Sequence, residues 1–226
     1  MKSKTLLPPL DAESFANLMG DTFRSANMAL TSVVQGVAFG VLLLNAYQIF
    51  LRPGAEFPWH IVVYPLMSFI SLVTVTFEYS HYVGVFGRAV NVTDVYLPYL
   101  VGITEIAPMF FFSRVNLWWF CQGVFVLVAA ISWLNSARHC SDEVFGENNG
   151  PRGRYKRTMY INSAVAVPVG ALSVTGSFYI LSSKSFWLES TMCVAMLSFG
   201  VFITLKSQHL IWGLQRDFGF EPIRRL

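Results

Sequence analysis

The chain alternates between long apolar stretches and short polar segments. Six stretches hold about 20 or more mostly apolar residues each, the length that a helix needs to cross a bilayer. They cover residues 27–51, 58–83, 93–112, 115–135, 158–182 and 186–213. Short turns near residues 52–57, 113–114 and 183–186 join these stretches in pairs. The pattern predicts an all-α, polytopic membrane protein with six transmembrane helices arranged as three hairpins.

The composition agrees with a membrane protein. Hydrophobic residues make up 54% of the 226 residues and charged residues only 13%, whereas soluble domains carry about 25% charged residues. We divide the chain into a cytoplasmic N-terminal segment (1–26), a six-helix transmembrane domain (27–214) and a cytoplasmic C-terminal tail (215–226). We expect an integral protein of the plasma (inner) membrane, with the lipid bilayer as its partner and no nucleic acid.

Basic residues are concentrated on one side of the predicted membrane. Lysine and arginine accumulate in short cytoplasmic loops, and an N-terminus inside the cell places twelve of them inside and three outside. The inside set is Lys2, Lys4, Arg24, Arg88, Arg138, Arg152, Arg154, Lys156, Arg157, Arg216, Arg224 and Arg225, and the outside set is Arg52, Arg114 and Lys184. The asymmetry predicts that both termini are cytoplasmic.

Two cytoplasmic segments have a recognisable character. Residues 7–23 place apolar side chains at roughly helical spacing, which predicts an amphipathic helix lying flat on the inner membrane surface. The longest connection, 136–157, ends in a basic run made of Arg152, Arg154, Lys156 and Arg157. This run could fix the topology by its charge, or it could bind anionic lipid or a cytoplasmic protein.

Ionisable residues near the inner ends of two spans fall at matching depths. Glu78 lies 20 residues into the second span and Lys206 lies 20 residues into the sixth. Charged groups within a span often pair with one another, so a Glu78–Lys206 contact is predicted. His81 and His209 follow them in sequence and could make an inner gate sensitive to pH.

Glu105 is the acidic residue farthest from both ends of its span. It lies about 12 Å in from the outer surface, because eight residues of helix separate it from the turn at 113–114. Gln122 in the fourth span lies at the same level, so Glu105 could be a neutral acid that donates a hydrogen bond to Gln122 or a carboxylate that faces water. Pro108 tends to kink the helix nearby. An acid at this depth is a candidate transport site, although a Glu–Gln clamp between packed helices is the structural alternative.

Small residues predict close helix packing in two spans. Gly36 and Gly40 form a GxxxG pattern, which serves either dimerisation or packing within one chain. The fifth span is rich in small residues over 162–177, which indicates either helix packing or a pore wall.

Metal chemistry and soluble-enzyme chemistry have little support. His81, His139 and His209 lie at predicted inner helix ends, one from each hairpin, and could bind a metal if the hairpins surround a centre. No closely spaced ligand pair supports that site, the three cysteines form no CxxC pair, and no phosphate-binding or nucleophile motif occurs. The sequence therefore assigns no cofactor.

Three functional hypotheses follow from these residues. The first is a small channel or transporter for an ion, proton or small solute, with Glu105 and Gln122 in the outer half and an inner gate beyond them. The second is a non-enzymatic membrane subunit, sensor or effector that binds a cytoplasmic partner. The third is a membrane metalloenzyme that uses the inner-face histidines. With only six predicted helices, the chain is expected to form a homo-oligomer or to join a membrane complex.

Overall fold

The computed structural model describes residues 12–51, 60–85, 92–139, 149–183 and 186–217. In these residues the chain forms six α-helices and one short 3-10 helix, without a strand. The elements are α1 (Ala12–Phe50), α2 (His60–Val85), α3 (Val92–Ile106), η1 (Ala107–Phe110), α4 (Val115–His139), α6 (Asn149–Ser183) and α7 (Phe186–Asp217). The all-α prediction is confirmed.

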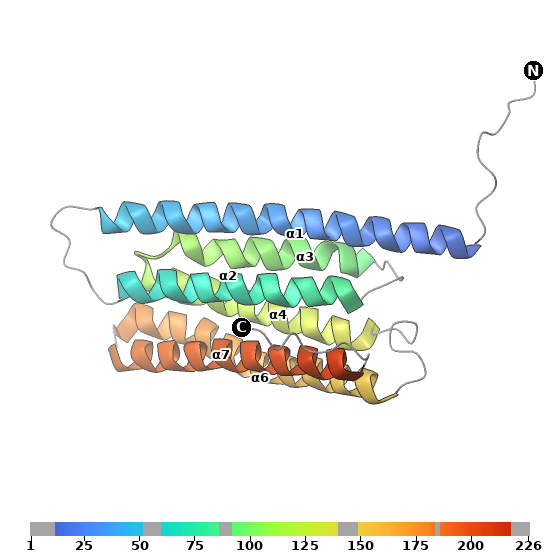
Figure 1. Ribbon diagram of the computed structural model, residues 1–226. Helices are drawn as coiled ribbons and strands as arrows, with labels where there is room; N and C mark the ends of the chain where they lie inside the picture. Colours follow the sequence, from blue (N-terminus) through green and yellow to red (C-terminus); the bar gives the residue numbers. More distant parts are fainter. Residues whose placement is uncertain (1–11, 52–59, 86–91, 140–148, 184–185, 218–226) are drawn as a thin grey trace, which may run out of the picture.

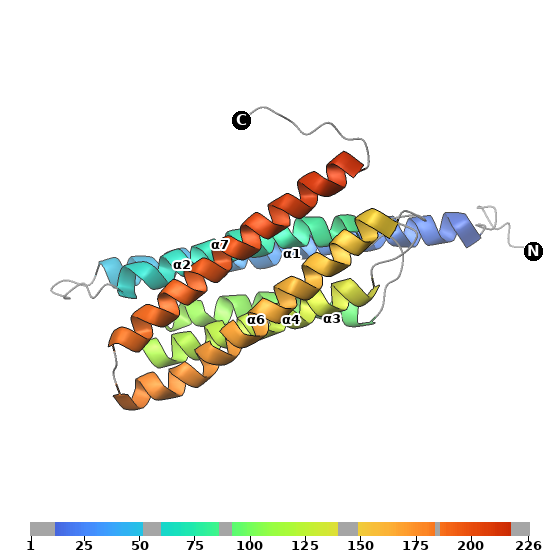
Figure 2. The same ribbon diagram turned by 90° about the horizontal axis from the view of Figure 1, so that it is seen from below.

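The helices form an elongated bundle with alternating direction (Figure 1). α2, α4 and α7 run the same way, and α1, α3 and α6 run in the opposite direction. We call the end where α2, α4 and α7 begin the proximal end, and the end where they finish the distal end. Seen from below, α6 and α7 run obliquely to α1 and α2 (Figure 2).

Four helices are long and apolar enough to cross a membrane. The qualifying segments are Thr31–Phe50, Val115–Arg138, Gly150–Ser182 and Phe186–Leu214. A fifth apolar segment, Val62–Glu78 in α2, is shorter. The protein is therefore an integral membrane protein, whereas the predicted count of six spans is not established by length and composition alone.

Large apolar side chains cover much of the outside of the bundle. Examples from four helices are Val37, Phe69, Phe178 and Trp187, which are all more than two-fifths exposed. Such a surface is unusual for a protein in water but is suited to lipid, where an apolar side chain has no reason to turn inward. The buried core instead contains several polar residues.

The N-terminal region differs from the prediction. The sequence predicts an interfacial helix before a separate first span at 27–51, but α1 is continuous over 39 residues, or about 58 Å. No glycine or proline lies in residues 21–35, where a break would separate the two parts. α1 is therefore longer than the hydrocarbon layer of about 30 Å.

The predicted loop 136–157 is also mostly helical. α4 continues to His139 and α6 begins at Asn149, so the basic residues Arg152, Arg154, Lys156 and Arg157 lie on the first turns of α6. Arg154 and Arg157 are exposed, and Arg152 and Lys156 are half-buried. Arg154 lies against α7 at Gly213. The positive charge is thus fixed to a helix at the distal end.

Pro108 ends the third helix as its chemistry suggests. α3 stops at Ile106, and η1 carries Pro108 in its first turn. Proline has no N–H group for the α-helical hydrogen bond to residue 104, so the chain tightens into a 3-10 helix. Pro108 is buried, and its carbonyl accepts a hydrogen bond from Phe111 N at 2.9 Å.

A close helix contact joins α4 and α6. A Cβ atom placed on Gly123 would lie 2.9 Å from the carbonyl oxygen of Gly170 and 2.8 Å from the backbone nitrogen of Val174. One placed on Gly170 would lie 3.0 Å from the carbonyl oxygen of Gly123. We call this contact the glycine seam. The small-residue stretch at 162–177 therefore serves helix packing at Gly170.

Candidate functional site

One face of α2 carries a row of polar side chains through the bundle. The row consists of Tyr64, Ser68, Ser71, Thr74 and Glu78. Residues three or four positions apart share a face of a helix, and 14 residues of helix extend over about 21 Å. The opposite face of the same helix is apolar and exposed at residues such as Val62, Leu66, Phe69 and Val73.

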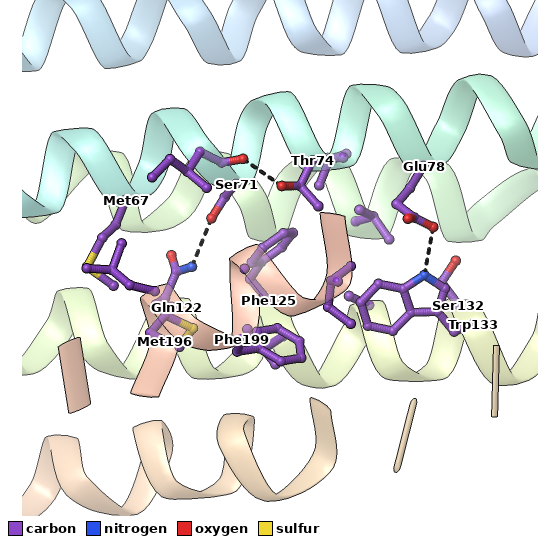
Figure 3. Close-up of a pocket in the computed structure, with 18 residues that line it drawn as sticks. Met67, Ser71, Thr74, Glu78, Gln122, Phe125, Ser132, Trp133, Met196 and Phe199 are labelled. Atoms are coloured by element: carbon purple, nitrogen blue, oxygen red, sulfur yellow. Dashed lines mark hydrogen bonds between the residues drawn. The ribbon is translucent and has the colours of Figure 1, made fainter. Parts of the chain in front are cut away.

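The part of this face that carries Ser71, Thr74 and Glu78 borders a cavity between α2, α4 and α7 (Figure 3). Its volume is about 90 Å³, which is room for several water molecules or one small ligand, because one water needs about 10–15 Å³ on this scale. The wall is mainly apolar, with a minority of polar residues. The polar and indole-bearing residues on the wall are Ser71, Thr74, Glu78, Gln122, Ser132 and Trp133.

Glu78 lies at the distal end of the cavity. Its Oε2 accepts a hydrogen bond from Trp133 Nε1 at 3.1 Å, and its Oε1 accepts one from the hydroxyl of Ser207. The predicted partner, Lys206, precedes Ser207 on α7 and is half-buried. The prediction named the correct pair of helices, α2 and α7. Successive side chains point about 100° apart around a helix axis, and it is Ser207, not the preceding Lys206, that points towards Glu78.

Neutral hydrogen bonds connect the helices in the middle of the row. Gln122 Nε2 donates to Ser71 Oγ at 3.2 Å. The hydroxyl oxygens of Thr74 and Thr204 lie 3.3 Å apart. These contacts link α2 to α4 and to α7, so all three helices around the cavity are joined by side-chain polar groups.

An aromatic cluster closes the row at the proximal end. The hydroxyl of Tyr64 donates to Glu189 on α7 and accepts a hydrogen bond from Trp119 Nε1 at 3.2 Å. The ring of Tyr64 stacks on Trp118, with ring centroids 4.0 Å apart and an angle of 4° between the planes. Tyr64, Trp118 and Trp119 have no exposed surface. A carboxyl group therefore lies near each end of the polar row.

Glu105 is not part of this cavity. It is 2% exposed and lies between α1 and α3, where its Oε2 accepts a hydrogen bond from Gln35 Nε2 at 3.0 Å. Of the two alternatives for Glu105, the hydrogen bond to Gln122 is not observed, because Gln122 faces α2 and Glu105 faces α1. Nearby, a Cβ atom on Gly102 would lie 2.3 Å from Val34 Cγ1, so α1 and α3 pack tightly here.

We predict that Glu105 and Gln35 stabilise the fold as a pair. Glu105→Leu leaves the buried amide of Gln35 without its partner, which costs about 1–3 kcal/mol. The double variant Gln35→Leu/Glu105→Leu removes both polar groups and should recover part of that loss. Unfolding in mixed detergent micelles measures both values. If the double variant loses as much unfolding free energy as the two single variants together, the two residues act independently.

The histidines do not assemble a metal site in the part of the chain that is described. His209 is exposed on α7, while the side chains of His81 and His139 lie outside the described residues. Among the described side chains, no three or more His, Cys, Asp or Glu residues converge in a way that could hold a metal ion. The metal hypothesis therefore gains no support from the geometry.

The GxxxG residues of α1 are not covered by another helix of the described chain. A Cβ atom on Gly36 or Gly40 would meet nothing within 4 Å, and both residues are exposed. Of the two roles predicted for this pattern, packing within the chain is not observed among the described residues. Dimerisation stays a prediction.

Sequence reasoning found Glu78 and Gln122 but missed most of the site. Tyr64 and Glu189 lie close to helix ends, where polar residues are expected for interfacial reasons alone. Ser71, Thr74 and Ser207 are common in transmembrane helices. The available signal was the spacing of polar residues within 64–78, which repeats every three or four positions in an otherwise apolar segment.

No protein-family model, curated protein or solved structure matches this chain. No activity can therefore be carried over from a relative. The polar row on α2 and the cavity beside it are the features of the described structure from which a function can be proposed.

Proposed function

We propose that the protein is a small channel or transporter for an ion, proton or small solute. The proposed path follows the polar row of α2 between α4 and α7, rather than the mid-membrane position of Glu105. The observation that carries the proposal is the cavity of about 90 Å³ along this row, between a carboxyl group at Glu189 and another at Glu78. A helix that served only as a membrane anchor would have no need of a polar face turned inward.

The proposal includes six membrane crossings in three hairpins. α2 and α3 pack beside the four long apolar helices and run antiparallel to their neighbours in the same bundle (Figure 1), which supports their crossing with them. Each hairpin then contributes its second helix, α2, α4 or α7, to the cavity. Basic residues at the distal end support a cytoplasmic placement of that end and of both termini, and we place the protein in the plasma membrane.

The exposed basic residues of α6 favour a second, compatible role. Arg154 and Arg157 are exposed on the first turns of α6, where they would meet anionic headgroups or an acidic protein on the cytoplasmic side. A sensor or assembly subunit could use this surface without any transport. The two roles differ in whether water enters the cavity.

Water access to Thr74 tests the transport proposal. In a chain whose three cysteines are replaced by serine, Thr74→Cys introduces a thiol into the cavity wall. We expect it to react with a charged, water-soluble methanethiosulfonate at least tenfold faster than Val73→Cys, because the neighbouring Val73 is 50% exposed on the lipid-facing side of α2. Labelling of the protein in liposomes, followed by mass spectrometry, measures both rates.

An exposed position completes this test. Arg157→Cys lies on the surface of α6 and reports the rate of an accessible thiol. If Thr74→Cys stays unmodified from both sides of the membrane while Arg157→Cys reacts fully, the cavity is closed to water and the transport proposal fails. The non-transporting subunit would then be the better account.

A further inference from the structure

We propose that the cavity between α2, α4 and α7 binds a small uncharged amide, held by hydrogen bonds to Gln122 and Ser71. This inference rests on the proposed function, since it names the class of solute for the same path. Figure 3 shows Gln122 and Ser71 towards one end of the lining residues, near Met67, with Glu78 and Trp133 at the other end.

Gln122 contributes a hydrogen-bond acceptor to the cavity wall. Its side chain is 2% exposed, and its amide group points into the space between the lining side chains (Figure 3). Nε2 donates to Ser71 Oγ at 3.2 Å, whereas Oε1 accepts no hydrogen bond from any residue that the structure describes. Buried polar atoms normally have a hydrogen-bond partner, so a ligand that carries an N–H group suits this oxygen.

The hydroxyl group of Ser71 contributes the complementary donor. Its oxygen accepts from Gln122, but its proton has no acceptor within the described part of the chain. Thr74, one turn further along α2, differs because its hydroxyl already donates to the carbonyl oxygen of Ile70 at 2.8 Å. Gln122 and Ser71 therefore offer an acceptor and a donor side by side. An amide group carries both complementary groups, a C=O and an N–H, on one planar unit.

The surroundings of this pair favour an uncharged ligand. Met67 and Phe125 belong to the mainly apolar wall. An ion placed there would lose its water and gain no opposite charge from Gln122 or Ser71, which is costly in an apolar cavity. Glu78 lies seven residues beyond Ser71, or about 10 Å along α2, so the proposed site does not depend on its charge.

The volume of the cavity limits the size of the amide. A protein cavity of about 150 Å³ holds benzene, which has six non-hydrogen atoms. The cavity of about 90 Å³ therefore accommodates about four such atoms on the same scale. Acetamide has this size, with an amide group for Gln122 and Ser71 and a methyl group for the apolar wall.

Saturation-transfer NMR on the full chain in lipid nanodiscs tests the inference with acetamide, acetate and acetamidinium. These three compounds have nearly the same shape and one methyl group each, but they are neutral, negative and positive, respectively. We expect saturable transfer from the protein to the methyl protons of acetamide, and at least tenfold weaker binding of the two charged compounds. Nanodiscs without protein correct for partition into lipid.

Substitutions at the two polar residues locate the binding. Gln122→Leu replaces the amide by an apolar group of similar size and should weaken acetamide binding at least tenfold. Gln48→Leu is the matched control, because Gln48 is exposed on α1 outside the cavity, and it should leave the affinity unchanged. If Gln122→Leu fails to fold, Ser71→Ala removes only a hydroxyl group and should weaken the binding several-fold.

The outcomes separate the site, the solute class and the path. Acetamide binding that neither Gln122→Leu nor Ser71→Ala changes would overturn the site, and equal binding of acetamidinium would overturn the uncharged class. Absence of acetamide binding to a protein whose Thr74→Cys thiol is open to water would overturn the amide and leave the path intact. A closed thiol would instead remove the proposed function itself.

Discussion

Replacing Gly123 by alanine is expected to destabilise the protein strongly, although the change adds only one methyl group. The added Cβ would lie 2.8 Å from the backbone nitrogen of Val174 and 2.9 Å from the carbonyl oxygen of Gly170. Both are backbone atoms, so neither can move aside by changing a rotamer, and α4 and α6 must separate. Overpacking of this kind costs about 1–3 kcal/mol or more. The midpoint of unfolding in mixed detergent micelles measures the loss.

The matched control is Gly36→Ala. It adds the same methyl group where nothing lies within 4 Å, and alanine favours a helix over glycine by up to about 1 kcal/mol. This variant should therefore be as stable as the parent or slightly more stable. Equal midpoints for the two variants would mean that the glycine seam is not a tight contact in the membrane-embedded protein.

Tyr64→Phe is expected to produce the second large loss of stability. The change keeps the ring that stacks on Trp118 at 4.0 Å and removes only the hydroxyl. That hydroxyl donates to Glu189 and accepts from Trp119 Nε1, so both partners lose a hydrogen bond at once. A buried polar group left without its partner costs about 1–3 kcal/mol. Thermal unfolding followed by near-ultraviolet circular dichroism measures the effect.

Tyr99→Phe serves as the control for this prediction. Tyr99 is 47% exposed on α3, and loss of its hydroxyl should change the unfolding temperature little. Similar temperatures for the two variants would indicate that water or lipid headgroups replace the hydroxyl of Tyr64. The aromatic cluster would then be an open vestibule and not a closed end of the polar row.

The difference between what depth and rotation determine is clearest at Glu78 and Glu105. Counting residues along each span placed Glu78 at the depth of α7 residues near 206, and the structure does pair Glu78 with that part of α7. The partner is Ser207, because depth depends on the helical rise whereas direction depends on rotation about the helix axis. Rotation is set by packing against other helices, and a sequence without known neighbours does not contain it.

Glu105 illustrates the same limit more strongly. Its level with Gln122 was predicted from spacing, but α3 turns Glu105 towards Gln35 of α1. Residue counting along the spans placed Gln122, and not Gln35, at the level of this acid, and only the arrangement of the bundle brings Gln35 to it. The candidate site moved for the same reason, from Glu105 to the face of α2 that borders α4 and α7.

The sequence by itself determined the all-helical class, the long apolar helices and a disturbance of the third helix near Pro108, because backbone hydrogen bonding and transfer into lipid are local properties of each segment. The tertiary structure decided which faces meet, where the cavity lies and which side chains pair. Those choices depend on side-chain packing and hydrogen bonds between residues as far apart in sequence as Tyr64 and Glu189, which no single segment encodes.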